Sequence, residues 1–204
     1  MLGITRSDRF SEDGLLIREL CHRINNELAS AISQLSLAAA RSRSCEVKAA
    51  LDDVSKRLHH YADVHRTLQM PDRCTFVDAS SHLEQLCRSI SRSKLESNNI
   101  KLVLIARPVS LPSDQCWRLG MIVYELVSNA ARHAFHGAEG YIKVDLRFAG
   151  SLVECRVSDN GTSSRPVKFG HGLSIVQGLV RLLDGRLEQS FGSRGSKSLV
   201  IFPI

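Results

Sequence analysis

The sequence predicts an α+β protein in which an N-terminal antiparallel helical hairpin precedes an α/β sandwich built on a mixed sheet. In the first third of the chain, apolar residues recur at alternating spacings of four and three, which is typical of packed helices. The remainder combines segments of strand-like alternation with helical patterns. Helices on one face of a mixed sheet form the α+β class. We expect two domains, the hairpin in residues 1–72 and the sandwich in residues 73–204.

The hairpin is predicted from Ser11 to about Leu68, with a short polar link around Ser42–Glu46 that makes its two arms antiparallel neighbours. The second arm has a clear a/d seam, formed by Val47, Leu51, Val54, Leu58, Tyr61, His65 and Leu68. The first arm has one apolar stripe, formed by Leu16, Leu20, Ile24, Leu28, Ile32 and Leu35. Because two helices alone bury too little surface, we expect a second copy to complete a four-helix bundle, which would make the protein a homodimer.

The elements of the second domain follow from caps, turns and periodicity. Asp78 is expected to cap a helix that runs to about Ser93, and Pro112 to open the helix that contains Glu125. The segments Tyr141–Phe148 and Leu152–Ser158 alternate on either side of a turn at Ala149-Gly150 and predict a β-hairpin. The other predicted elements are a helix at 172–183 and strands at 100–107, 186–190 and 197–202.

Charge and composition restrict the classes of partner and compartment. The formal net charge of +6 suits an anionic partner, such as nucleotide phosphates or an acidic protein face. Only 5% of residues are aromatic, which disfavours a nucleic-acid surface. The six cysteines show no metal or disulfide spacing and are expected to be free thiols. No apolar run approaches the ~20 residues that span a bilayer, so we expect a cytoplasmic protein without membrane contact.

His22 is the first candidate for chemistry. Leu20 and Ile24 lie on the apolar stripe, and position 22 is about 200° around the helix from each. The imidazole is therefore expected to point into solvent, where its neutral nitrogen can act as a nucleophile toward a phosphoryl group. Glu19 and Asn26 share its face, where Glu19 could orient the ring or accept its proton and Asn26 could contact a phosphoryl group or a water. The alternative is that His22 is only one polar residue on a solvated face of the helix.

A second set of polar residues lies on the helix that contains Glu125. Glu125, Asn129 and His133 recur at every fourth position, so they form one polar ridge opposite an apolar stripe. Such a ridge could line a ligand cleft. Two later segments have related features: Asp159 follows a predicted strand, and the GHG turn at Gly170–Gly172 precedes a helix, where backbone amides can approach phosphate.

Four segments in this order resemble the transmitter core of two-component histidine kinases: ELCHRINN at 19–26, ELVSNAARH at 125–133, VSDNG at 157–161 and GHGLSIV at 170–176. The first resembles the H-box of the subfamily with a His-Arg-x-x-Asn-x-Leu motif. The other three resemble the ATP-binding domain that histidine kinases share with gyrase-type ATPases. The resemblance implies a histidine-kinase-type ATPase fold for the second domain.

The resemblance also implies roles for particular residues. His22 would be the phosphorylated histidine, with Glu19, Asn26 and Glu125 assisting catalysis. Asn129 would bind Mg²⁺ on the ATP phosphates, and Glu125 would contact the ion through a water; an oxygen ligand of this kind suits Mg²⁺. Asp159 would accept a hydrogen bond from the adenine amino group. The remaining nucleotide-binding residues would be His133, Gly161, Gly170, Gly172 and Leu173. His65 also matches a family position, but its place on the seam favours a buried structural histidine.

The function expected from this resemblance is ATP-dependent autophosphorylation on His22 and transfer to an aspartate on the receiver domain of a response regulator, with sensing by a separate protein. Two departures keep an alternative open: Ser163 replaces a family glycine, and the loop Thr162–Phe169 is short for a nucleotide lid. The alternative is a histidine phosphotransferase, a phosphorelay adaptor whose degenerate domain does not use ATP. A serine kinase or a conformational ATPase of the same superfamily is disfavoured by the outward histidine on a hairpin.

Overall fold

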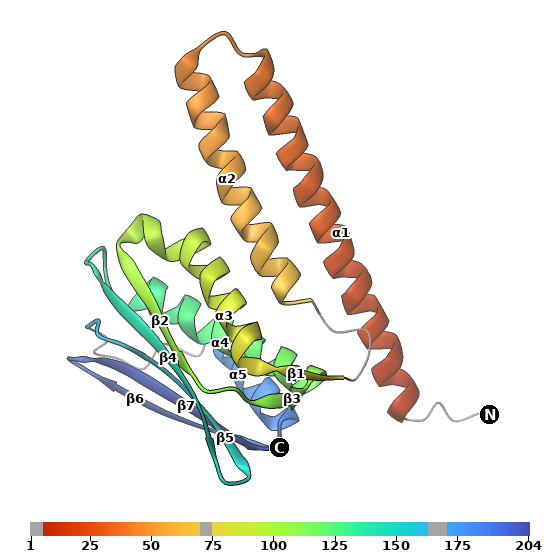
Figure 1. Ribbon diagram of the computed structural model, residues 1–204, viewed down its shortest axis with the longest axis vertical. Coiled ribbons are helices and arrows are strands. Elements are labelled where there is room, and N and C mark those ends of the chain that lie inside the picture. The colour runs from red at the N-terminus through yellow and green to blue at the C-terminus, as the bar shows by residue number, and fades with distance from the viewer. Residues whose placement is uncertain (1–5, 70–74, 163–170) are drawn as a thin grey trace. The chain divides into compact units, whose positions relative to one another are not determined.

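The computed structural model describes residues 6–69, 75–162 and 171–204. The chain divides into two compact units, Met1–Met70 and Pro71–Ile204. The first unit is helical, and the second unit combines a sheet with helices (Figure 1). In the described part of the chain, none of the helices has the length and apolar character needed to cross a membrane.

The first unit is the predicted helical hairpin, formed by α1 (Arg6–Arg41) and α2 (Cys45–Thr67). Ser44 caps α2, because its hydroxyl accepts a hydrogen bond from the Val47 amide. Both helices keep large apolar side chains exposed in the isolated protomer, namely Leu20, Ile24, Leu37, Val47, Val54 and Tyr61. One helix can cover only one side of its partner, so each arm retains an uncovered apolar surface.

The predicted seam of α2 is only partly covered in the protomer. His65 is exposed, as are Val47, Val54 and Tyr61 of the same seam, whereas Ala62 and Val64 are buried. The burial expected for His65 in a four-helix bundle therefore stays a prediction for the dimer.

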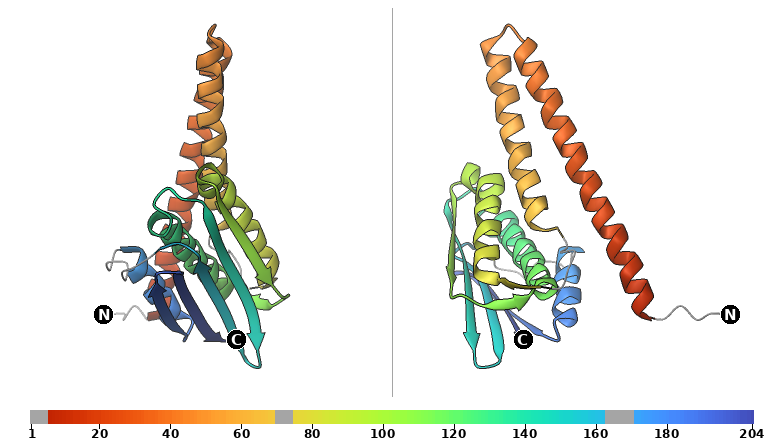
Figure 2. Two further views of the ribbon diagram at one scale, coloured as in Figure 1. Left: turned by 90° about the vertical axis from the view of Figure 1, so that its left-hand side faces the viewer. Right: turned by 45° about the vertical axis from the view of Figure 1, so that its right-hand side comes forward.

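The second unit contains a mixed five-stranded sheet in the order β2-β4-β5-β7-β6. Its strands are β2 (Ile100–Ala106), β4 (Gly140–Ala149), β5 (Leu152–Asp159), β6 (Arg186–Gly192) and β7 (Gly195–Pro203). The β2 and β4 strands are parallel, and the other neighbours are antiparallel. Three helices cover one face of the sheet: α3 (Ala79–Ile90), α4 (Ser113–His133) and α5 (His171–Leu182) (Figures 1 and 2). The α+β architecture predicted from the sequence is confirmed.

The core lies between the sheet and these helices. Inward residues alternate along each strand, as the period of two requires, and α4 contributes an apolar stripe against them. The buried members include Ile142, Val144 and Leu146 on β4, Val153, Cys155 and Val157 on β5, and Leu119, Ile122, Val123, Leu126 and Val127 on α4. The apolar stripe predicted for the Glu125 helix is therefore the surface that fixes α4 on the sheet and turns its polar ridge away from the core.

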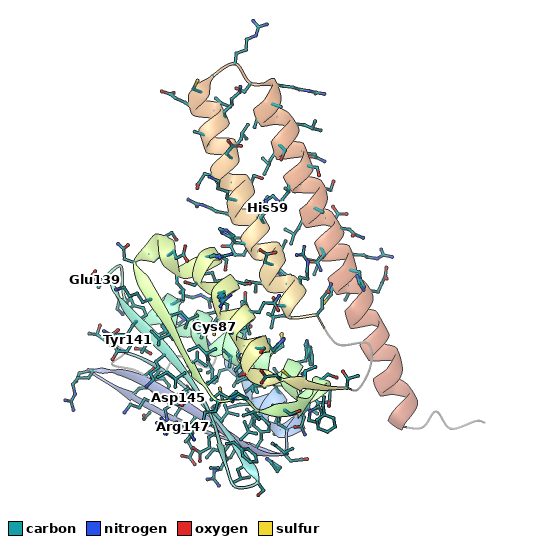
Figure 3. All side chains as sticks on the ribbon, in the orientation of Figure 1. His59, Cys87, Glu139, Tyr141, Asp145 and Arg147 are labelled. Atoms are coloured by element: carbon teal, nitrogen blue, oxygen red, sulfur yellow. The ribbon has the colours of Figure 1, made fainter. Side chains whose placement is uncertain are left out.

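The opposite face of the sheet carries one buried carboxylate. Asp145 on β4 is 4% exposed, and the Arg147 guanidinium donates to both of its oxygens, at 2.7 and 2.8 Å (Figure 3). This ion pair holds the pKa of Asp145 below its ordinary value. Asp145 is therefore a buried acid on the face of the sheet opposite to the core residues Val144 and Leu146.

The cap at Asp78 is confirmed, since its carboxylate accepts from the amides of Ser80 and Ser81 at 3.1 and 3.4 Å. Two features near it were not predicted. A two-stranded sheet joins β1 (Phe76–Asp78) to β3 (Ser110–Pro112). The helix predicted to reach Ser93 ends as α at Ile90 and continues as a π turn at Ser91–Leu95 and a 3₁₀ turn at Glu96–Asn98.

Candidate functional site

His22 lies on α1, and its side chain is exposed, as its position between Leu20 and Ile24 predicts. Asn26, one turn further, is exposed as well. Glu19 accepts a hydrogen bond from the Arg23 guanidinium at 2.9 Å, so in this arrangement its carboxylate is engaged by arginine. Both partners of this ion pair are largely solvated, and such pairs contribute little to stability. The Glu19 carboxylate can therefore exchange its arginine partner at small cost.

The polar ridge of α4 is present. Glu125, Asn129 and His133 are all half-buried, whereas Leu126 and Val127 beside them are buried in the core. The helix begins at Ser113 after Pro112. The negative charge of Asp114 in its first turn interacts favourably with the positive end of the helix dipole. The ridge is therefore carried by a rigid helix that is anchored on the sheet.

A cleft lies beside this ridge, with an empty volume of about 470 Å³ that includes space open to solvent. Four predicted residues line it together, although they come from three separate elements or turns: Asn129, His133, Asp159 and Leu173. The other lining residues are Leu126, Ala130, Ala134, Gln189, Phe191, Ser196 and Ser198.

Asp159 is the acid of the cleft and is only 7% exposed. Its Oδ1 accepts from the Gly161 amide at 2.9 Å and from the Ser196 amide at 3.3 Å, and its Oδ2 accepts from the Ser196 hydroxyl. These donors fix the carboxylate at the end of β5. Each carboxylate oxygen has two lone pairs, so the group retains capacity to accept from a ligand.

Two predicted glycines lie in close contact with their surroundings. A Cβ added to Gly172 would be 2.8 Å from Glu125 Oε2 and 3.6 Å from Asn129 Nδ2, so the start of α5 directly contacts the ridge. A Cβ added to Gly161 would be 2.3 Å from the Ala134 carbonyl oxygen, which leaves room only for glycine there. Gly170, Ser163 and most of the loop 162–169 lie outside the described residues.

The sequence interpretation missed the contribution of β6 and β7. Gln189, Phe191, Ser196 and Ser198 all line the cleft, yet the segments that contain them were read only as strands. A signal was present, because Ser196 and Ser198 alternate in phase with the buried Val200 and Phe202. Polar residues at inward positions of a strand indicate a site when they gather at one end.

The chemistry of these groups fits ATP and Mg²⁺. Asn129 has an amide oxygen and Glu125 a carboxylate, which are the ligand types that Mg²⁺ prefers, and both lie next to Gly172 at the start of α5. The first amides of a helix can bind phosphate. Within the described ranges, no group of three His, Cys, Asp or Glu side chains is placed to hold a metal ion.

Two protein families match consecutive parts of the chain. Residues 19–94 match the family described as histidine kinase, and residues 101–190 match the histidine kinase-like ATPase domain. The first match includes His22, and the second includes Glu125, Asn129, His133, Asp159 and Gly172.

Two proteins that are similar to this chain are named histidine kinases. The sensor histidine kinase PdtaS of Mycobacterium tuberculosis is 30% identical over 95% of this chain and 40% of its own length. The blue-light-activated histidine kinase 2 of Erythrobacter litoralis is 24% identical over 97% of this chain and 59% of its own length. This chain therefore spans only part of the length of either relative.

A solved structure supports the fold. The histidine kinase domain of the blue-light-activated kinase EL346 from Erythrobacter litoralis superimposes with a TM-score of 0.63 at 19% identity, over 86% of this chain and 95% of that domain. The order of the two units, the mixed sheet with helices on one face and both family matches agree. The chain belongs to the histidine kinases and has the architecture of their transmitter core, a dimerisation and phospho-accepting domain followed by an ATPase domain.

Proposed function

We propose that this chain acts as a two-component histidine kinase core that binds ATP in the cleft beside α4 and autophosphorylates on His22. The observation that carries the proposal is the cleft itself, where Asn129, His133 and Asp159 converge from separate elements. Both catalytic and binding functions of a kinase need such convergence, because phosphoryl transfer depends on positioning and charge neutralisation.

In the proposed reaction, an imidazole nitrogen of His22 attacks the γ-phosphorus of ATP. The bond between that phosphorus and the β,γ-bridging oxygen breaks and ADP leaves. The ring, protonated on its other nitrogen, then loses that single N–H proton to solvent or to a nearby base such as Glu19. Asn26 contacts the transferred phosphoryl group. The exposure of His22 supports this role, because a nucleophile that serves two successive partners must be accessible.

The proposed nucleotide contacts use the residues of the cleft. Asp159 accepts from the adenine amino group, and Gly161 and Leu173 lie beside the base. His133 donates to a phosphate, and the backbone amides of Gly172 at the start of α5 and of Gly170, which lies outside the described residues, would donate to phosphate oxygens. Mg²⁺, held by Asn129 and through a water by Glu125, would neutralise charge on the phosphates.

The second step is transfer of the phosphoryl group from His22 to an aspartate of a response-regulator receiver domain. We further propose that the hairpin, residues 1–72, dimerises into a four-helix bundle through the exposed apolar side chains of α1 and α2. The five described cysteines are free thiols, which supports a reducing compartment such as the cytosol.

The test is incubation of the purified protein with γ-labelled ATP and Mg²⁺, followed by measurement of acid-labile label. The wild type and His59→Gln are expected to be labelled, whereas His22→Gln is not. His59 is a matched control, because it is also an exposed histidine of the hairpin (Figure 3). If no label appears, yet a phosphorylated receiver domain transfers phosphate back to His22, the protein is a phosphorelay adaptor and the kinase proposal is wrong.

A further inference from the structure

The floor of the cleft changes from apolar to polar along β7. The inward residues Val200 and Phe202 are apolar and lie in the core, whereas Ser196 and Ser198 on the same face line the cleft. On the neighbouring strand β6, Gln189 also lines it. Polar groups are costly to bury without partners. Their confinement to the cleft end of two adjacent strands therefore points to recognition of a ligand.

Ser198 and Gln189 form a defined pair. The Gln189 amide nitrogen donates to the Ser198 hydroxyl oxygen at 3.0 Å, and Ser198 is only 7% exposed. A serine hydroxyl has two acceptor lone pairs and one donor proton, so a hydroxyl that accepts from Gln189 keeps its proton for another partner. Among the residues that the structure describes, no acceptor takes that proton. Buried donors normally find an acceptor, and here the ligand can supply it.

The cleft therefore presents a donor and an acceptor from neighbouring strands. Asp159 is an acceptor at the end of β5, and Ser198 is a donor on β7, which pairs with β5. The edge of adenine offers the complementary pair, a donor at the amino group and an acceptor at the adjacent ring nitrogen N1. Guanine has the opposite pattern on this edge, an acceptor at O6 and a donor at N1. The polarity of the floor thus matches adenine and opposes guanine.

We propose that Ser198 is a specificity-determining residue that donates its hydroxyl proton to N1 of the adenine ring, and that Gln189 is a positioning residue that sets the direction of this proton. This inference rests on the proposed function, because it requires an adenine nucleotide in the same cleft.

The test is equilibrium binding of ADP, 1-deaza-ADP and 7-deaza-ADP by the full chain. 1-Deaza-ADP replaces the N1 acceptor by C–H, and 7-deaza-ADP is the matched ligand control. In the wild type, 1-deaza-ADP is expected to bind about 2- to 10-fold more weakly than ADP, the equivalent of one ordinary hydrogen bond. In Ser198→Ala, ADP binding falls by a similar factor, and the difference between ADP and 1-deaza-ADP disappears. The penalty for 7-deaza-ADP stays the same in both proteins.

Two further variants separate hydrogen bonding from a structural role. Ser198→Thr retains the hydroxyl and is expected to restore the preference for ADP over 1-deaza-ADP. Gln189→Glu replaces the amide donor with a carboxylate, which takes the Ser198 proton, so the two ligands are expected to bind equally. A merely structural role would weaken both ligands by the same factor in every variant and leave their ratio unchanged.

The outcomes distinguish this inference from the proposed function. If ADP binds and depends on Asp159, but the ratio of ADP to 1-deaza-ADP affinity is the same in wild type and Ser198→Ala, the role of Ser198 is overturned and the nucleotide site stands. If the wild type binds no adenine nucleotide, both the site and the inference are overturned.

Discussion

Replacement of Asp159 by asparagine is expected to separate nucleotide binding from folding. Asparagine has nearly the same shape as aspartate but presents one amide oxygen and one NH₂ group. The oxygen can keep the two backbone contacts that Asp159 Oδ1 makes, to the amides of Gly161 at 2.9 Å and Ser196 at 3.3 Å. The NH₂ group then occupies the position of Oδ2, where it can donate to the Ser196 hydroxyl after that hydroxyl rotates.

The expected effect on stability is therefore small. No contact need be lost, because the bond between Ser196 and residue 159 reverses direction and does not disappear. The variant loses stability because neutral hydrogen bonds replace charge-assisted ones. It gains stability because residue 159, which is only 7% exposed, no longer buries a charge. We expect the free energy of unfolding to change by about 1 kcal/mol or less.

The expected effect on nucleotide affinity is larger. In the proposed complex, the adenine amino group donates to the Asp159 carboxylate, and a hydrogen bond to a charged acceptor contributes about 1.5–3 kcal/mol. The NH₂ group of asparagine would oppose this donor. We therefore expect ADP to bind about 10- to 100-fold more weakly.

The assay is isothermal titration with ADP and Mg²⁺, with thermal unfolding measured on the same samples. Asp145→Asn is the matched control, because Asp145 is also a buried acid but lies on the opposite face of the sheet. That variant is expected to bind ADP like the wild type. Unchanged ADP affinity in Asp159→Asn would refute the assignment of Asp159 to base recognition.

Three further predictions concern stability and assembly. Asp78→Ala removes the cap of α3 and is expected to lower the free energy of unfolding by about 1 kcal/mol, measured by urea denaturation. Hydrogen bonds from Ser81 and Ser80 lower the pKa of Asp78 from 3.8 to about 2. The stability that this carboxylate contributes is therefore present above pH 3.8 and lost as the pH falls toward 2. Asp78→Asn should keep the cap but lose this pH dependence, and an unchanged dependence of stability on pH would contradict the assignment. Burial lowers the pKa of His82 below its ordinary value of 6.5, so the folded state resists protonation and stability should fall as the pH drops below 6.5. In His82→Gln this loss should be reduced, as seen in melting temperatures between pH 5 and 7.5; an equal loss would exclude His82 as its source. If the hairpin forms the proposed dimer, Val54→Asp is expected to give a monomer in light scattering, whereas Lys56→Glu, on the other side of α2, is not. A dimer that survives Val54→Asp would place the interface elsewhere.

Local patterns in the sequence were sufficient for most of the fold. The spacing of apolar residues predicted both helices of the hairpin, and the side chain of Asp78 identified the start of α3. The alternation in β4 and β5 identified their hairpin. These features depend on residues within a few positions of one another, so a single sequence records them directly.

Features that depend on distant partners were not predictable in this way. The β1 and β3 strands have three residues each, too few to show alternation, and they pair across more than thirty residues of chain. The Ser196 hydroxyl reaches Asp159 across 37 positions, so the cleft side of β7 becomes visible only in the fold.

Transfer of the γ-phosphoryl group of ATP to His22 underlies the whole proposed function. Its most direct test is to incubate the protein with γ-labelled ATP and Mg²⁺, digest it at neutral pH and locate the label by peptide sequencing. We expect label on the single peptide that contains His22, and loss of that label in Asp159→Asn at limiting ATP. Label on another histidine, or label on His22 that is unaffected by Asp159→Asn, would contradict it.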